Sequence, residues 1–151
     1  MDETSPAAIA RALMNGCDRA VLCTSLPADG WPYGSLVAVA PDRDGAPLLY
    51  LSDLAEHTRN LAAEPRAALV FAAAEDGSDP LSRPRATALG RIGRSDDEDR
   101  LQRYLARHVA AHAYRGFRDF HLYRMEVERV HLVAGFGSIH WLAAHEVLNQ
   151  A

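Results

Sequence analysis

The sequence predicts a mainly β fold, in the form of a small barrel or sandwich with helices packed against its outside. Apolar segments of strand length recur along the chain, and turn residues separate them roughly every 8–12 residues. Helical periodicity is confined to a few short segments. The 151 residues fit one domain, and we expect residues 1–151 to form it, with an N-terminal helix over 1–16 and a C-terminal tail over 142–151.

The first half of the chain supplies a helix, three strands and a second, short helix. Ser5 and Pro6 are typical of a helix start, and Gly16 is typical of a helix end. The segments "PADGWP" and "PDRDG" are turn sequences. Pro65 ends the second helix because the residue before a proline avoids helical backbone. The expected strands are 20–26, 33–40 and 47–52, and the second helix is 54–63.

The second half supplies further strands and three helical segments. Strands over 66–74 and 85–94 flank the loop "EDGSDPLSRP", and two glycines in the second of them indicate a bulge or a close backbone approach. Ser95, followed by acidic residues, is the expected N-cap of a helix. The remaining expected elements are a short helix over 109–115, two antiparallel strands within 120–137 joined tightly near Glu128–Arg129, and a final helix in "WLAAHEVLNQ".

Composition excludes several classes of partner. The net charge is −4, so no overall basic field attracts nucleic acid or an anionic membrane. No segment approaches the ~18 apolar residues of a membrane-spanning helix, and "MDETSPAAIARALMNG" lacks the basic start and apolar core of a secretion signal. We therefore expect a cytoplasmic protein that binds neither nucleic acid nor membrane.

The cysteines and histidines form no metal-ligand pattern. Cys17 and Cys23 lack C-x-x-C spacing, and Cys23 alternates with Val21 in an apolar segment, which favours burial. His108 and His112 have the spacing of one helical face, but no third ligand is near, so a solvated or dimer-facing pair is favoured. We expect no metal site.

Polar side chains interrupt the apolar pattern in "LSDLAEHTRNLAAEPRAALVF", residues 51–71. Loops between core strands usually hold Gly, Pro, Asp and Asn, whereas this one holds hydroxyls, an imidazole, a guanidinium and an amide. Such donors suit an anion, and an arginine fork bonds phosphate bidentately. A second group of arginines could also bind an anion: Arg83, Arg85, Arg91 and Arg94. The alternative is that these arginines are exposed positions on an amphipathic strand.

Longer motifs resemble a known family over about residues 6–142. The segments "PYGSLVAVAPDRDGAPLLYLSDLAEHTRNLAAEPRAALVF", "DPLSRPRATALGRI", "RYLARH" and "FRDFHLYRMEVERVHLVAGFG" resemble the pyridoxamine 5′-phosphate oxidase-like FMN-binding split barrels, and among them the HugZ-type haem-degrading subgroup. The resemblance implies a six-stranded Greek-key split β-barrel that forms a homodimer, with FMN in a cleft between the subunits. Phe117, Phe120 and Phe136 are then candidates for burial at the dimer interface, or else in the core of one chain.

The resemblance also implies the residues that hold FMN. The cofactor supplies the chemistry, and the protein positions it. The implied residues are Ser35, Leu36 and Val37 along the isoalloxazine edge, Ser52, His57, Thr58 and Arg59 at the phosphate with Asn60 in support, and Arg85 and Thr87 at the flavin or its ribityl chain.

Departures from the family pattern keep three functions open. His57-Thr58-Arg59 stands where the oxidases have Arg-Lys, and their substrate-binding Trp and Arg have no counterparts, which argues against vitamin B6 oxidation. The leading interpretation is an FMN-binding, oxidoreductase-like homodimer of unknown substrate. One alternative is a haem-binding or haem-degrading protein of the same fold, with His140 or His145 as iron ligand. The other is a dimeric binding protein without a cofactor.

Overall fold

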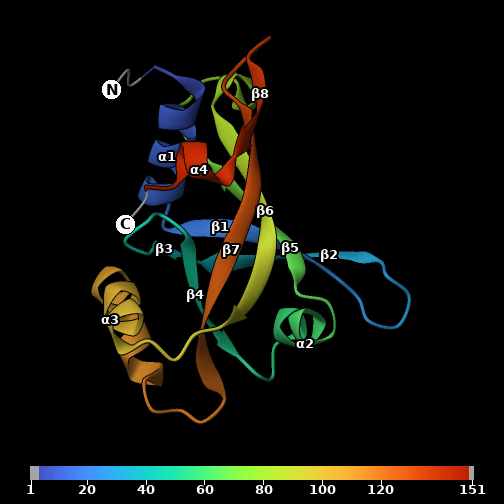
Figure 1. Cartoon of the computed structure of the whole chain (residues 1–151), viewed down its shortest axis with the longest axis vertical. Helices are drawn as coiled ribbons and strands as arrows, with labels where there is room; N and C mark the ends of the chain where they lie inside the picture. The colour runs from blue at the N-terminus through green and yellow to red at the C-terminus, as the bar shows by residue number, and fades with distance from the viewer. Residues whose placement is uncertain (1–3, 150–151) are drawn as a thin grey trace.

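An antiparallel sheet of eight strands forms the centre of the structure, a computed structural model that describes residues 4–149 (Figure 1). The strand order is β2-β1-β5-β6-β7-β4-β3, and β8 pairs with the second half of β7. The prediction of a mainly β fold is confirmed, with eight strands where the resemblance implied six. The strands are β1 (Arg19–Ser25), β2 (Pro32–Ala38), β3 (Ala40–Pro41), β4 (Pro47–Ser52), β5 (Arg66–Ala72), β6 (Arg85–Arg94), β7 (Phe120–Val133) and β8 (Ile139–Ala143).

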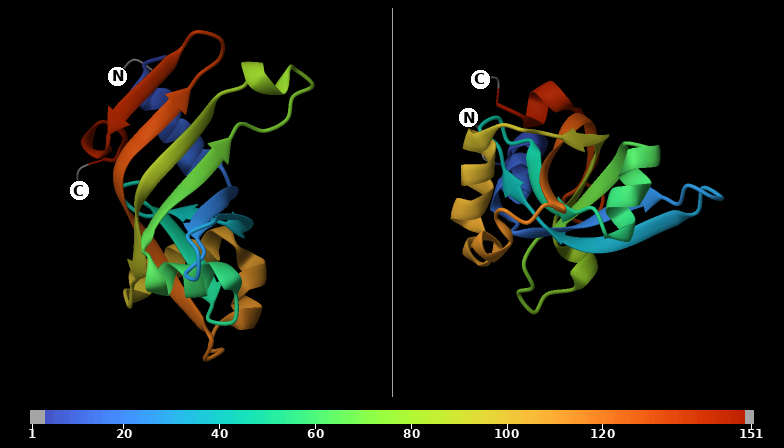
Figure 2. Two further views of the ribbon diagram at one scale, coloured as in Figure 1. Left: turned by 90° about the vertical axis from the view of Figure 1, so that its right-hand side faces the viewer. Right: turned by 90° about the horizontal axis from the view of Figure 1, so that it is seen from below.

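The twisted sheet curls into a half-barrel, and short helices flank it (Figure 2). The helices are α1 (Pro6–Gly16), α2 (Glu56–Ala63), α3 (Glu98–Arg107) and α4 (Ala144–Val147), with 3-10 turns at Pro80–Ser82 and Val109–Tyr114. Within residues 4–149, none of the helices has the length and apolar character needed to cross a membrane.

Two apolar clusters bury opposite sides of the sheet. The larger one fills the inside of the curl, where α1 covers it with Ala10 and Met14. The N-terminus of α1 is capped as predicted, because Ser5 Oγ accepts a hydrogen bond from the Ala8 backbone at 3.1 Å. The smaller cluster lies under α3 and includes Tyr104, Leu105, Leu48 and Leu122.

A β-bulge divides the long strand β7 into two halves that face the core with opposite phase. Leu89 of β6 pairs with Arg129, but the next residue, Gly90, pairs with Val127, so Glu128 is an extra residue. The inward-facing positions therefore change from odd to even numbers at the bulge: Tyr123, Met125 and Val127 before it, and Val130 and Leu132 after it.

Gly90 makes this bulge possible. A Cβ atom at this position would lie 2.3 Å from the Glu126 carbonyl oxygen, so the glycine permits the close backbone approach that the sequence indicated. The tight turn expected at Glu128–Arg129 is wrong, because the strand continues through the bulge to Val133 and the chain turns at residues 134–138 instead.

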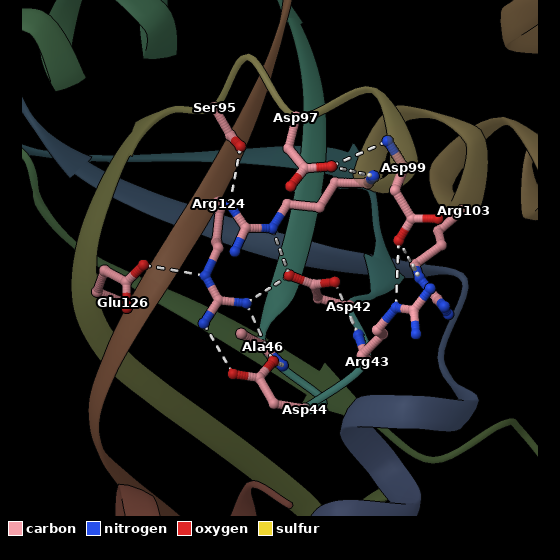
Figure 3. Close-up of polar contacts among 11 residues, drawn as sticks. Asp42, Arg43, Asp44, Ala46, Ser95, Asp97, Asp99, Arg103, Arg124 and Glu126 are labelled. Atoms are coloured by element: carbon pink, nitrogen blue, oxygen red, sulfur yellow. Dashed lines mark hydrogen bonds and ion pairs between the residues drawn. The ribbon is translucent and has the colours of Figure 1, made fainter. Parts of the chain in front are cut away.

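A network of arginines and aspartates fastens α3 to the sheet (Figure 3). Arg124 of β7 donates to Asp42 at 2.6 Å and to Asp44 at 2.8 Å, both in the turn between β3 and β4. Arg100 of α3 donates to the same Asp42 carboxylate at 2.8 Å and to Ser95 Oγ at 3.0 Å. The hydrogen bond from Arg124 lowers the pKa of Asp44. The network thus holds α3 against the end of the sheet.

Three expected features of the helices are wrong. Asp97, not Ser95, caps α3, since its carboxylate accepts from the Asp99 backbone at 2.9 Å. His108 and His112 share no face of α3, which ends at Arg107; His108 instead bonds through Nε2 to the Val39 carbonyl at 2.7 Å. Within the described part of "WLAAHEVLNQ", which ends at residue 149, the first residues complete β8 and only Ala144–Val147 form a helix.

Candidate functional site

Three elements bring two of the predicted anion-binding residues, Ser52 and His57, to one cavity. β4 ends at Ser52, and after a three-residue turn α2 begins at Glu56, beside β2. An open cavity of about 250 Å³ lies where these elements meet. Its walls include the predicted Leu36, Val37, Ser52 and His57, together with the aromatic rings of Tyr50, Tyr104 and Phe120.

His57 lies at this cavity and contacts β2 through Ser35. Ser35 Oγ lies 3.2 Å from His57 Nδ1. Burial lowers the pKa of His57 below its usual value, so the imidazole is neutral at neutral pH. When Ser35 donates to Nδ1, the ring hydrogen resides on Nε2, where it remains available as a donor.

Ser52 holds the turn before α2. Its hydroxyl donates to Asp119 at 2.8 Å and accepts a hydrogen bond from the Leu54 backbone at 3.1 Å. The single hydroxyl hydrogen of Ser52 is directed to the Asp119 carboxylate, so it is not available to an anion. Ser52 therefore fixes the shape of the turn before α2.

The first turn of α2 carries donors and a hydroxyl without partners. Ala55, at the N-cap, has no side chain that accepts from the first backbone N–H groups. Thr58 is only 5% exposed, and its Oγ1 makes no hydrogen bond with any residue from 4 to 149. Such a group costs about 1–3 kcal/mol when left unsatisfied. Arg59 is exposed, and its guanidinium makes no ion pair within the described residues. Glu64, at the end of α2, pairs with Arg66.

Asn60 points into the protein and supports the helix. Its side chain is fully buried and lies 3.0 Å from Thr24 Oγ1. With its oxygen toward this hydroxyl, its nitrogen donates to the Glu56 carboxylate at 2.8 Å. The supporting role expected for Asn60 agrees with this position.

Arg85 and Thr87 do not join this group within one chain. Arg85 pairs with Val133 at one end of β7, whereas Ser52 pairs with Phe120 at the other end, roughly 40 Å away along the strand. Arg85 donates to the Leu81 carbonyl at 3.2 Å. Both residues lie on the outer face of the half-barrel, the side opposite the large core.

The outer face carries an exposed apolar band. Alternation places Leu36 there, away from its inward neighbours Ser35 and Val37. Cys23 also lies there, half-buried, because Leu22 and Thr24 face the core; its expected full burial is wrong. We define the outer band by its apolar members: Val21, Leu36, Val70, Leu89, Val133, Ile139 and Trp141.

An arginine-lined hollow of about 510 Å³ lies at the end of this band. Its cationic side chains are Arg66, Arg91 and Arg129, and it also holds Glu64 and Glu128. Arg66 pairs with Glu64, and Arg129 lies 3.6 Å from Glu128. Arg91 makes no hydrogen bond or ion pair with any residue from 4 to 149, although, after the hydrogen bond from Arg66, its charge helps to lower the pKa of Glu64. The hollow, called here the arginine hollow, holds three arginines against two glutamates.

Sequence reasoning missed the grouping of His131, Trp141 and Arg129 on the outer face. The ring of His131 lies 4.5 Å from that of Trp141, and the Arg129 guanidinium lies 5.4 Å from the same indole. The expected turn at residues 128–129 hid this arrangement. The alternation of buried Val130 and Leu132 with half-buried His131 was the available signal.

The two histidines proposed as iron ligands lie elsewhere. His140 lies on the inner side of β8, paired with the buried Leu132, and its Nε2 is 3.2 Å from Ser138 Oγ. His145 is exposed on α4, which packs beside α1 (Figure 1).

Comparisons with known proteins agree with this fold. The curated "Non-canonical heme oxygenase HOZ, chloroplastic" of Arabidopsis thaliana is 36% identical over 137 residues, which cover 87% of this chain and 41% of that protein. The "Glutamyl-tRNA reductase-binding protein, chloroplastic" of the same plant is 36% identical over 101 residues, 67% of this chain and 29% of that protein. The chain therefore matches less than half the length of either relative.

Solved structures show the same similarity. A heme binding protein from Mycobacterium smegmatis superposes with a TM-score of 0.89 at 31% identity, over 97% of this chain and 61% of that one. HutZ from Vibrio cholerae, at 20% identity and a TM-score of 0.64 over 83% of this chain and 91% of that one, shares the fold. The model of the family described as "CREG, beta-barrel" matches residues 1–149, and the chain belongs to this family of split barrels.

Proposed function

We propose that this protein binds haem on its outer face, at the interface of a homodimer. The observation that carries the proposal is the presence on one face of an apolar, aromatic band that ends at the arginine hollow. Haem is a flat, largely apolar ring with two carboxylates and an iron that accepts an axial side-chain ligand. The band offers apolar surface for the ring, and the hollow offers guanidinium groups for the carboxylates.

The exposure of the band supports a ligand or partner there. Trp141 is 59% exposed, Ile139 61% and Leu36 70%, although all three are large and apolar. Exposed large apolar side chains on one face are typical of binding sites when they gather into a patch. The names of two relatives, a heme oxygenase and a heme binding protein, give haem preference over other flat ligands.

A hemin titration tests the proposal. We expect saturable binding with a defined Soret band. Arg91→Gln removes a charge-assisted hydrogen bond of about 1.5–3 kcal/mol, so affinity should fall about 10- to 150-fold. Arg103→Gln, on α3 and away from the outer face, is the matched control and should bind like the wild type. Non-saturable binding, or equal affinity in the two variants, would contradict the proposal.

The exposed outer band is also the reason for proposing a homodimer. Ile139→Glu places a charge within the outer band and should shift the protein to a monomer in sedimentation velocity experiments. Leu81→Glu changes an equally exposed apolar residue in the loop before β6 and should leave the dimer intact. A monomeric wild-type protein at micromolar concentration contradicts this assembly. Phe117 and Phe136, 53% and 78% exposed, are outside the core of one chain and remain candidates for burial in the dimer.

A second candidate ligand, FMN, is favoured by one specific observation. The Thr58 hydroxyl has no partner within residues 4–149, and no side chain caps the first turn of α2, which also carries His57; these features suit a phosphate. Arg59 would add two parallel hydrogen bonds to it. The function would then be that of an FMN-binding, oxidoreductase-like protein.

Fluorescence titration with FMN tests this candidate. Arg59→Ala should weaken FMN binding by roughly ten- to several-hundred-fold, and Arg59→Lys by less, because an ammonium cannot reproduce the fork. Riboflavin, which lacks the phosphate, should bind the wild type and Arg59→Ala equally. Unchanged FMN affinity in folded Arg59→Ala would remove the phosphate assignment. A protein that shows neither flavin nor Soret bands would support the cofactor-free binding protein.

A further inference from the structure

We propose that His131 is the axial ligand of the haem iron, in place of His140 or His145. The inference rests on the proposed haem binding and assigns the iron ligand within it. His131 lies on the outer face of β7, after the bulge, with Thr87 beside it on β6 and Trp141 beside it on β8. It is the histidine that the structure places within the outer band.

The His131 ring is available for coordination. Neither of its nitrogens makes a hydrogen bond within residues 4–149, although the side chain is half-buried. Its ring lies 4.5 Å from that of Trp141 at an interplanar angle of 47°, so the indole supports the imidazole from one side. An imidazole held in this way has a nitrogen free to coordinate a metal.

The position of His131 relative to the arginine hollow matches the shape of the ligand. Arg129 lies two residues away on the same face of β7, which is about 7 Å along a strand. Leu89 of β6 pairs with Arg129 and supplies apolar surface to the hollow. If His131 held the iron, Arg129 and Arg91 would be the residues that hold the haem carboxylates.

The other histidines are less suitable for a haem on this face. Four have hydrogen-bond partners: His57 with Ser35, His108 with Val39, His121 with Asp53 and Arg94, and His140 with Ser138. His112 and His145 are exposed and lie in the turn after α3 and on α4, outside the outer face.

Ferric haem spectroscopy on the full chain tests the assignment. Wild-type protein with hemin should give a histidine-ligated spectrum by absorption and magnetic circular dichroism. His131→Ala should lose that signature, lower hemin affinity by about tenfold or more, and recover the signature when free imidazole is added. His131→Met keeps the side-chain volume and should give the distinct spectrum of a thioether ligand. His140→Ala and His145→Ala are the matched controls and should retain the wild-type spectrum.

The outcomes separate the two proposals. A histidine-ligated spectrum that survives in His131→Ala and His131→Met, or that disappears in His140→Ala or His145→Ala, overturns His131 as the ligand and leaves haem binding in place. A wild-type protein that does not bind hemin overturns both. Circular dichroism of each variant before hemin is added shows whether the fold is retained, and His131→Met decides the matter if His131→Ala unfolds.

Discussion

Replacing Arg124 by methionine should remove a large share of the stability of the fold. The Arg124 side chain is 12% exposed, and the Asp42 and Asp44 side chains that it contacts are 7% and 23% exposed. The substitution keeps much of the volume but leaves two carboxylates without this guanidinium (Figure 3). Breaking a buried ion pair by removing one partner costs about 3–5 kcal/mol. For a domain of this size, that corresponds to a fall in Tm of about 6–20 °C.

The pH dependence of this loss has a defined sign. Arg124 lowers the pKa of Asp44 in the folded state, so the stabilisation is present above the unfolded carboxyl pKa and is lost as the pH falls through the lower, folded value. The difference in stability between wild type and Arg124→Met should therefore be largest near neutral pH. It should shrink below about pH 4, the ordinary pKa of an aspartate.

Urea denaturation at several pH values measures both effects. Arg43→Met is the matched control, because Arg43 pairs with Asp99 while both side chains are more than half exposed, and its loss should cost no more than about 1 kcal/mol. An Arg124→Met protein within 1 kcal/mol of wild type at pH 7, or a loss equal to that of Arg43→Met, would refute the view that this network fastens α3 to the sheet.

Three further outcomes follow from the structure. Gly90→Ala should destabilise the protein by about 1–3 kcal/mol in urea, because its Cβ would lie 2.3 Å from a neighbouring backbone carbonyl oxygen, whereas Gly93→Ala, with open space around it, should cost less than 1 kcal/mol. NMR titration of the apo protein should show His57 gaining its proton below its usual pKa of about 6.5, and an unshifted value would contradict its burial. Asn60→Ala should cost about 1–3 kcal/mol, since Thr24 Oγ1 loses its buried partner; thermal unfolding indistinguishable from wild type would argue against that contact.

The sequence by itself determined the class of the fold and the bounds of several elements. Strands 47–52 and 85–94 have the predicted bounds, and the helix predicted within 1–16 begins after Ser5 and ends at Gly16. Alternation, turn residues and the Ser5-Pro6 start are local signals that act within a few residues. Ser52 at the end of strand 47–52 and His57 in the next helix also line one cavity, since a strand end and the next helix start are close in space whatever the rest of the fold does.

Only the tertiary structure decided how distant strands are aligned. The extra residue Glu128 shifts β7 by one position against β6, and a shift of one residue turns every later side chain to the opposite face. In the sequence this break in alternation is indistinguishable from a tight turn, which is why the expected hairpin at 128–129 was wrong. In the structure the same break brings His131 to the outer face beside Trp141, because pairing between β7 and β8 over residues 129–143 fixes which rings meet.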